Sequence, residues 1–222
     1  MTKVLLTGFE PFGHTPTNPA ESVARALDGT FIGEAEIVAR IVPCAFFECI
    51  EFVNAAIAEV QPDLVIMMGE YGGRSMITVE RIAQNFNDGT RYQLVDNAGK
   101  VLQGQPTVAD GPAAYYTTLP LRAMVKAMRA SGIPADISDA AGTFCCNHLM
   151  YGILHHIATE RLPIRAGWIH LPHLPCVAAL DENLGAPSMS VETSTTGVKL
   201  GIQAALENPQ DIEEASYSRL QI

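Results

Sequence analysis

Short apolar stretches alternate with segments of helical periodicity along most of the chain. Five stretches are rich in apolar residues and lie at residues 4–8, 35–42, 63–68, 135–138 and 166–171. Apolar runs of this length are typical of strands in a sheet that is covered on both faces. Between them, apolar residues recur at helical spacing, as from Phe46 to Ile57. The alternation predicts a mostly parallel, twisted sheet with helices on both faces, a three-layer α/β/α arrangement like that of phosphorylase and hydrolase folds.

Capping residues mark where helices begin. Asn18 and Pro19 predict a helix start, because asparagine caps a helix and proline fits its first position. Ser190 can cap a final helix that reaches Leu206. The polar, acidic tail at residues 208–222 is predicted to fray. No linker or repeat divides the chain, so we expect one α/β domain over residues 1–222.

Residues 75–111 interrupt the alternation. Ile77 and Val79 look like strand residues, but Asn87-Asp88-Gly89 and residues 96–99 carry turn chemistry. We interpret the segment as an irregular, hairpin-like excursion from the sheet, of the kind that carries function or subunit contacts.

Charge and cysteine content narrow the class of protein. The 222 residues carry a formal net charge of −10, which argues against nucleic acid or an anionic membrane as a partner. The apolar run near the N-terminus is too short for a signal peptide, and no run is long enough to cross a bilayer. Five cysteines without disulfide-framework spacing fit a reducing compartment. We therefore predict a cytoplasmic protein that binds neither nucleic acid nor membrane.

Two adjacent cysteines, Cys145 and Cys146, lie where a predicted strand gives way to a predicted helix that runs to Arg161. A thiol at a helix start feels the positive end of the helix dipole, which lowers the thiol pKa. Free backbone N–H groups at the same place can hold an oxyanion. One of the two cysteines is therefore a candidate nucleophile. The alternative is that both are small buried hydrophobes, which is the commoner role of cysteine.

A histidine at the end of the last predicted strand supplies a candidate base. Ligands of parallel α/β sheets gather at the carboxyl ends of the strands, where His170 and the cysteines are expected to meet. An imidazole titrates near neutral pH and can take the proton of a thiol. A third group then holds the ring in place. Spacing alone leaves three candidates for that group: Glu70, Glu80 and Asp88.

Six segments, in chain order, resemble the bacterial pyroglutamyl peptidases of type I, also called pyrrolidone-carboxylate peptidases. The cysteine motif is GTFCCNHLMYG at residues 142–152, the glutamate motif is GGRSMITVER at 72–81, and the histidine motif is AGWIHLP at 166–172. LTGFEPFG at 6–13, GPAAY at 111–115 and APSMS at 186–190 also match. The likeness runs from about residue 4 to about residue 205.

The resemblance implies a cysteine peptidase that removes an N-terminal pyroglutamyl (5-oxoprolyl) residue from peptides through an acyl-enzyme. It assigns the nucleophile to Cys146, the base to His170 and the orienting group to Glu80. It implies no cofactor and no metal, and a homo-oligomer, commonly a tetramer. The residues that it places around the substrate are Phe9, Phe12 and Phe144 as walls for the lactam ring, with Glu70 and Cys145 beside it. Arg91 corresponds, across a gap, to an arginine near the active site.

Three features depart from the family pattern. Many relatives carry Gln-Ala where this chain has Glu70-Tyr71, His173 replaces a common tyrosine, and residues 85–108 differ in length. A Glu70 carboxylate that meets the lactam can accept from the ring N–H but repels the ring carbonyl. The first change therefore bears on substrate preference more than on the reaction.

Three other interpretations stay open on the residues alone. One is a zinc site with ligands from His148, His170, His173, Cys145, Cys146 and Cys176; nearby prolines and the lack of a CxxC pair argue against it. Another is a phosphorylase-like enzyme whose residues 69–74 cradle a phosphate, against which the Glu70 carboxylate argues. The third is an inactive, oligomer-forming relative.

Overall fold

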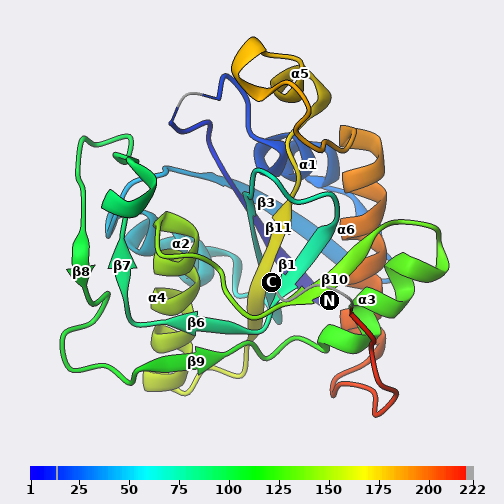
Figure 1. Cartoon of the computed structure of the whole chain (residues 1–222). Coiled ribbons are helices and arrows are strands. Elements are labelled where there is room, and N and C mark those ends of the chain that lie inside the picture. Colours follow the sequence, from blue (N-terminus) through cyan, green and yellow to red (C-terminus); the bar gives the residue numbers. More distant parts are fainter. Residues whose placement is uncertain (14, 219–222) are drawn as a thin grey trace.

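Seven strands form one sheet in the computed structural model, which describes residues 1–13 and 15–218 (Figure 1). They are β1 Lys3–Phe9, β2 Phe31–Ile32, β3 Ala35–Val42, β4 Leu64–Glu70, β5 Ile77–Glu80, β10 Ala135–Ser138 and β11 Arg165–Leu171. Their order across the sheet is β10, β5, β11, β4, β1, β3, β2. Strands β11, β4, β1 and β3 pair in parallel, as do β5 and β10, whereas β5 is antiparallel to β11 and β2 to β3. The predicted mostly parallel sheet is confirmed.

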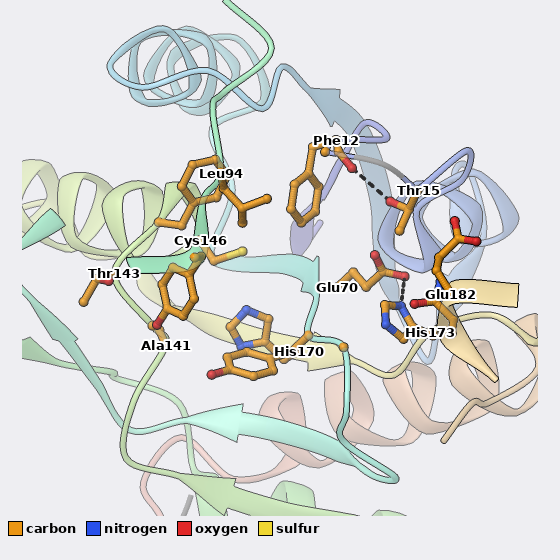
Figure 2. Close-up of a pocket in the computed structure, with 17 residues that line it drawn as sticks. Phe12, Thr15, Glu70, Leu94, Ala141, Thr143, Cys146, His170, His173 and Glu182 are labelled. Atoms are coloured by element: carbon orange, nitrogen blue, oxygen red, sulfur yellow. Dashed lines mark hydrogen bonds and ion pairs between the residues drawn. The ribbon is translucent and has the colours of Figure 1, made fainter. Parts of the chain in front are cut away.

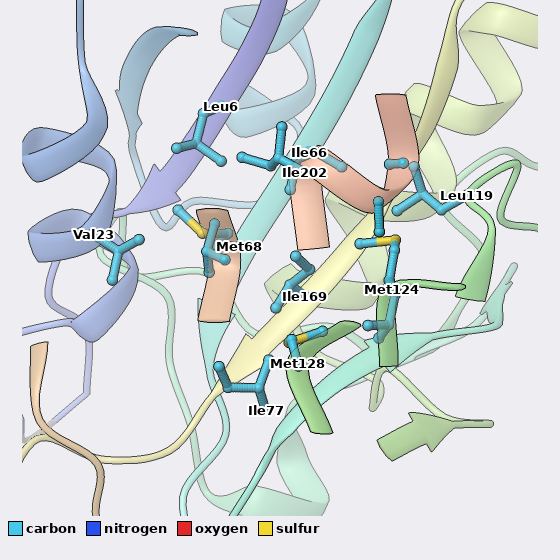
Figure 3. Packing of buried hydrophobic residues seen from close by; sticks show 14 of the residues in the cluster. Leu6, Val23, Ile66, Met68, Ile77, Leu119, Met124, Met128, Ile169 and Ile202 are labelled. Atoms are coloured by element: carbon cyan, nitrogen blue, oxygen red, sulfur yellow. The ribbon is translucent and has the colours of Figure 1, made fainter. Parts of the chain in front are cut away.

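Helices cover both faces of this sheet. One face carries α1 (Pro19–Leu27), α3 (Leu121–Ala130) and α6 (Val191–Glu207), and the other carries α2 (Glu48–Val60) and α4 (Cys145–Glu160). Figure 3 shows Val23, Met128 and Ile202, one from each helix of the first face, packed around strand residues. The three-layer arrangement is confirmed, and burial on both faces explains why the central strands are apolar throughout.

Polar side chains cap the helices where the sequence predicts it. The Asn18 side chain accepts a hydrogen bond from the Ala20 N–H at 2.9 Å, at the start of α1. The Ser190 hydroxyl accepts from the Thr193 N–H at 3.2 Å, at the start of α6. α4 differs, because Phe144 precedes its first residue and supplies no capping side chain. The first turn of α4 therefore keeps backbone N–H groups that the helix itself does not use.

The hairpin-like excursion is present, but it begins later than predicted. Ile77 and Val79 belong to β5, inside the main sheet between β11 and β10. Both are fully buried, so packing on the sheet outweighs the turn-rich sequence that follows. After β5 the chain forms two small antiparallel pairs, β6 (Ile82–Gln84) with β9 (Ala114–Tyr116) and β7 (Asn87–Asp88) with β8 (Gln103–Gln105). A 3₁₀ turn, η1 (Thr90–Tyr92), lies between β7 and β8.

The C-terminal segments lie around this framework. β11 is followed by α5 (Pro175–Ala178) and the 3₁₀ turn η2 (Asp181–Asn183). In the tail after α6, the Asp211 carboxylate accepts from the N–H groups of Arg122 and Ala123, so it caps α3. The predicted fraying concerned residues 208–222; of these, 219–222 lie outside the described residues. Across the described part of the chain, no helix combines the length and the apolar character that a bilayer crossing requires.

Candidate active site

A cavity of about 430 Å³ opens at the carboxyl ends of the central strands (Figure 2). One side is apolar and includes Phe12, Leu94 and Phe144; the rings of Phe12 and Phe144 lie 6.0 Å apart. The other side is polar and includes Glu70 and His173. No lysine or arginine is among the described residues that line the cavity. The position agrees with the expectation for ligand sites in parallel α/β sheets.

Cys146 lies in the first turn of α4 and lines the cavity. Its sulfur lies against the end of β4, where a Cβ atom on Gly69 would come within 2.8 Å of Sγ and 2.7 Å of the Trp168 ring. Gly69 therefore leaves the space that the thiol occupies. The buried Asn147 fixes the same turn, because its side chain accepts from the Gln84 N–H at 2.8 Å and donates to the Gln84 carbonyl at 2.9 Å.

Two residues that the sequence places at the substrate do not line the cavity. Cys145 is fully buried behind it, in an apolar cluster that also contains Cys44 and Cys49. Consecutive residues of a helix point in different directions, so only one of the two adjacent thiols faces the cavity. Phe9 is also buried, and its ring packs 5.6 Å from that of Trp168. The structure therefore places both side chains behind the cavity wall, where they support it.

His170 lies at the end of β11, with its ring facing the same cavity as Cys146 (Figure 2). The ring Nδ1 is 2.8 Å from Oε1 of Glu80, and both side chains are almost completely buried. The antiparallel register explains the contact between residues so distant in sequence, because β11 runs beside β5 with His170 opposite Thr78. The other ring nitrogen, Nε2, has no hydrogen-bond partner among the described residues. It is available to a thiol or a substrate.

The other two candidates for the orienting group are elsewhere. Asp88 is half-buried and accepts from the Thr90 N–H at 3.1 Å. Glu70 is on the opposite side of the cavity, where its Oε1 is 2.8 Å from Nδ1 of His173. Of the three carboxylates that spacing left open, only Glu80 bonds His170. Arg91 lies outside the cavity lining, with its guanidinium 5.1 Å from the ring centre of Tyr92, which does line it.

Arg74 is part of this constellation, although the sequence singled it out only within a glycine-rich loop. Its Nη1 donates to Oε1 of Glu80 at 2.7 Å, the oxygen that also faces His170, and it contacts the Thr78 hydroxyl. Its side chain is only about 10% exposed. A lone arginine two glycines after a strand carried too little signal to be assigned a partner, because that partner lies on the next strand.

Burial sets the protonation states of the site. It raises the pKa of the Cys146 thiol well above 9.0, with the neighbouring Cys44 and Glu80 acting in the same direction. It lowers the pKa of His170 below 6.5, against the opposing hydrogen bond to Glu80. Burial also favours the neutral form of Glu80, but His170 and Arg74 outweigh it and hold the pKa of that carboxyl below its ordinary value. The site at rest therefore holds a thiol, a neutral imidazole and a carboxylate.

The predicted low pKa of the thiol is wrong for this site. A helix dipole stabilises a charge by at most about 2 kcal/mol, whereas taking a charge out of water costs several kcal/mol. Desolvation of the buried sulfur therefore dominates. The thiol must lose its proton during the reaction, to a base beside it, and not beforehand.

Histidines of the zinc interpretation have other partners. His173 bonds Glu70, and Nε2 of His148 accepts from the Phe47 N–H at 3.0 Å. Within residues 1–13 and 15–218, no group of three or more histidine, cysteine, aspartate or glutamate side chains is arranged to hold a metal ion.

Known proteins similar to this chain form a consistent set. A family model described as pyroglutamyl peptidase matches residues 2–208. Pyrrolidone-carboxylate peptidases of Mycobacterium marinum and Mycobacterium tuberculosis are 65% and 63% identical to it over 222 residues, with 100% of both chains covered. A pyrrolidone-carboxylate peptidase 2 of Photorhabdus laumondii is 49% identical over 209 residues, 94% of each chain.

Solved structures give the same result. The crystal structure of pyroglutamyl peptidase I from Bacillus amyloliquefaciens superposes with a TM-score of 0.91 at 40% identity, covering 96% of this chain and 99% of that one. A mutant pyrrolidone carboxyl peptidase from Pyrococcus furiosus superposes with a TM-score of 0.88 at 41% identity, covering 93% and 99%. Sequence and fold agree over almost the full length, and the chain therefore belongs to the pyroglutamyl peptidase family.

Proposed function

We propose that the protein is a cysteine peptidase that removes an N-terminal pyroglutamyl residue from peptides, with Cys146 as nucleophile, His170 as general base and acid, and Glu80 as the group that orients His170. The observation that carries the proposal is that Cys146 and His170 line one cavity, while Glu80 bonds the far nitrogen of the His170 ring. This is the arrangement that a thiol nucleophile needs: a base beside it and a third group behind the base.

The reaction divides into two halves. Nε2 of His170 takes the thiol proton as the Cys146 sulfur attacks the carbonyl carbon that follows the lactam ring. Free N–H groups in the first turn of α4 stabilise the oxyanion that forms. The imidazolium, held by the Glu80 carboxylate, then protonates the departing amine and leaves a thioester. A water molecule that gives its proton to His170 attacks the thioester, which releases pyroglutamate and restores the thiol.

The chemistry of the cavity suits the substrate. A pyroglutamyl group has no charged α-amine and presents a flat, mostly apolar ring with one N–H and one carbonyl. The apolar side with Phe12, Leu94 and Phe144 can cover such a ring, and an apolar pocket with few polar groups is how proteins select small neutral ligands.

A panel of blocked amides tests the proposed activity. We expect release of a chromogenic amine from the pyroglutamyl amide, and at least about 100-fold slower release from the prolyl and glutaminyl amides, because a site matched to the lactam leaves its polar groups unpaired with either analogue. The prolyl amide lacks the ring carbonyl and the glutaminyl amide lacks the ring. Equal rates with all three amides would contradict the assignment, and phosphate-dependent turnover of a nucleoside without peptidase activity would favour the phosphorylase-like alternative.

The pH profile follows from the two buried partners. Because His170 must be neutral to take the thiol proton, and burial lowers its pKa below 6.5, kcat/KM is expected to fall only below about pH 6.5. Because burial raises the pKa of Cys146 above 9.0, no alkaline decline from early loss of the thiol proton is expected below about pH 9. A profile of kcat/KM from pH 4 to pH 10 measures both the decline at low pH, the acid limb, and any decline at high pH, the alkaline limb. An acid limb above pH 7 would contradict the neutral thiol and imidazole.

Glu70 is proposed to contact the lactam. Glu70→Gln keeps an acceptor for His173 but replaces the charge with a group that also donates to the ring carbonyl. We expect KM for the pyroglutamyl amide to fall by roughly 3- to 10-fold, since a hydrogen bond contributes about 1 kcal/mol, with kcat changed less than about twofold. Glu182→Gln is the matched control, because it removes the same charge from the same cavity. An equal fall in KM with Glu182→Gln would mean that net charge, and not contact with the ring, is responsible.

Three further properties belong to the same proposal: a single domain over residues 1–222, a cytoplasmic location and a homo-oligomer, with a tetramer as the expected form. All five cysteines are free thiols, which fits a reducing compartment. Light scattering coupled to size-exclusion chromatography measures the mass of the assembly directly.

A further inference from the structure

The guanidinium of Arg74 joins three segments that each carry a part of the proposed active site. Nη1 donates to Oε1 of Glu80 on β5 at 2.7 Å. Nη2 donates to the Ser138 hydroxyl, at the end of β10, at 3.2 Å and to the Ala140 carbonyl, in the segment that leads from β10 to α4, at 3.3 Å. Arg74 itself follows β4. The Arg74 side chain therefore links the Glu80 carboxylate, which bonds His170, to the segment that leads into α4, where Cys146 lies.

Arg74 also reaches His170 by a second route, through Tyr71. The guanidinium carbon lies 3.8 Å from the centre of the Tyr71 ring, a distance typical of a strong cation–π contact. The Tyr71 ring in turn meets the His170 imidazole edge to face, with ring centres 5.1 Å apart. Arg74 fixes Tyr71, and Tyr71 limits the rotation of His170. The imidazole is thus held by Glu80 at Nδ1 and by Tyr71 against its ring.

We propose that Arg74, with Tyr71 packed beneath its guanidinium, is a positioning residue that holds the His170 imidazole in register with Cys146. The inference rests on the proposed peptidase function and adds to it a requirement outside the three reacting groups. Arg74 does not itself line the cavity; it acts through Glu80, through Tyr71, which does line the cavity, and through the segment before α4. A shift of about 1 Å in such a constellation is enough to cost roughly 100-fold in rate.

The charge of Arg74 has an effect on titration that packing alone would not have. Arg74 lowers the pKa of His170, while Glu80 raises it. The titratable and charged groups around His170 are Glu80 on β5, Arg74 and Tyr71 after β4, Cys146 on α4, and, across the cavity, Glu70 and His173. Removing only the arginine charge leaves the Glu80 carboxylate uncompensated, so the pKa of His170 must rise.

Arg74→Met tests both parts of the inference. We expect kcat for the pyroglutamyl amide to fall by roughly 10- to 100-fold, with KM changed less than about twofold, and the acid limb of kcat/KM to move to higher pH. Arg74→Lys keeps the charge but cannot span Glu80, Ser138 and Ala140 together. It is expected to leave the acid limb in place and recover only part of kcat. Tyr71→Ala removes the ring and is expected to lower kcat with the acid limb unmoved, whereas Tyr71→Phe keeps the ring and is expected to recover most of the kcat that Tyr71→Ala loses.

Arg129→Met is the matched control, because Arg129 also bonds a buried carboxylate, Asp136 at 2.9 Å, and a backbone carbonyl, but away from the cavity. We expect it to lower the melting temperature without changing kcat or the pH profile. NMR titration of the His170 imidazole provides a readout that needs no substrate. Parent enzyme that cleaves no pyroglutamyl amide would overturn the proposed function, whereas an unchanged His170 titration in Arg74→Met, or an equal kcat loss in Arg129→Met, would overturn the role of Arg74.

Discussion

Replacement of Cys146 by serine is expected to lower kcat for a pyroglutamyl amide by about 10⁴-fold or more, whereas replacement of Cys145 leaves most of the activity. Losing the nucleophile of a catalytic triad removes covalent catalysis and leaves only substrate binding and oxyanion stabilisation. A serine hydroxyl in the same place is a much weaker acid than the thiol, and His170 is proposed to serve as its base with a lowered pKa. Steady-state rates of both variants with one chromogenic amide make the comparison.

Cys145 provides the matched control for this prediction, since it is the adjacent residue and the same substitution can be made. Its side chain is fully buried in an apolar cluster. Cys145→Ser buries a hydroxyl there at a cost of about 1–3 kcal/mol, so its melting temperature should fall while kcat per folded molecule holds. Cys145→Ala removes the thiol without burying a hydroxyl, so it separates the loss of the thiol from the cost of the buried hydroxyl. Loss of activity equal to that of Cys146→Ser, in protein shown to be folded, would reverse the assignment of the nucleophile.

Glu80→Gln is expected to lower kcat by roughly 10³-fold. Oε1 of Glu80 faces three donors, from His170, Arg74 and Thr78. If the glutamine oxygen takes that position, the imidazolium formed during the reaction loses its counter-charge, and the NH₂ group is buried in place of Oε2. If the NH₂ group takes it, His170 must accept at Nδ1 and carry its proton on Nε2, which then cannot receive the thiol proton.

Asp136→Asn is the control for Glu80→Gln. Asp136 is another buried carboxylate paired with an arginine, on the strand next to β5. Its replacement should reduce stability without changing kcat. Circular dichroism melting curves and rates measured on the same preparations distinguish a loss of stability from a loss of catalysis. A Glu80→Gln enzyme with more than about a tenth of the parental kcat would contradict the proposed role of Glu80 as the group that orients His170.

The sequence predicts the layers of the fold well, because its strands are buried on both faces and its helices have distinct apolar faces. Asn18 and Ser190 mark helix starts by local chemistry, which needs no knowledge of tertiary contacts. β5 is harder to place. Four buried residues followed by turn-rich sequence fit either a hairpin or a sheet strand, and the antiparallel insertion beside β11 depends on contacts distant in sequence. Local patterns carry no information about that register.

The candidate site, like the fold, is only partly predictable from local sequence patterns. The pair Cys145 and Cys146, together with His170, could be proposed from their places at a helix start and a strand end, and the family resemblance selected Cys146 from the pair. Glu80 could not be chosen over Glu70 and Asp88 by spacing, because its contact with His170 follows from the register of β5 beside β11. Only the family resemblance selected it.

The wall of the cavity shows a further limit of sequence patterns. Phe9 and Phe12 look equivalent in the sequence, yet Phe9 still belongs to β1 and is buried against Trp168, while Phe12 lies beyond the strand and lines the cavity. The thiol pKa was predicted from the helix dipole alone. The opposing effect, desolvation, depends on how deeply the sulfur is buried, which only the packed structure provides.

The most direct test of the central claim is reaction with a pyroglutamyl chloromethyl ketone, followed by mass spectrometry of the digested protein. We expect one pyroglutamyl group per chain, on the sulfur of Cys146, formed in step with loss of activity and slowed by free pyroglutamate. Cys44, Cys49, Cys145 and Cys176 should remain unmodified. Labelling of one of these four in place of Cys146, or loss of activity without a pyroglutamyl group on Cys146, would contradict it.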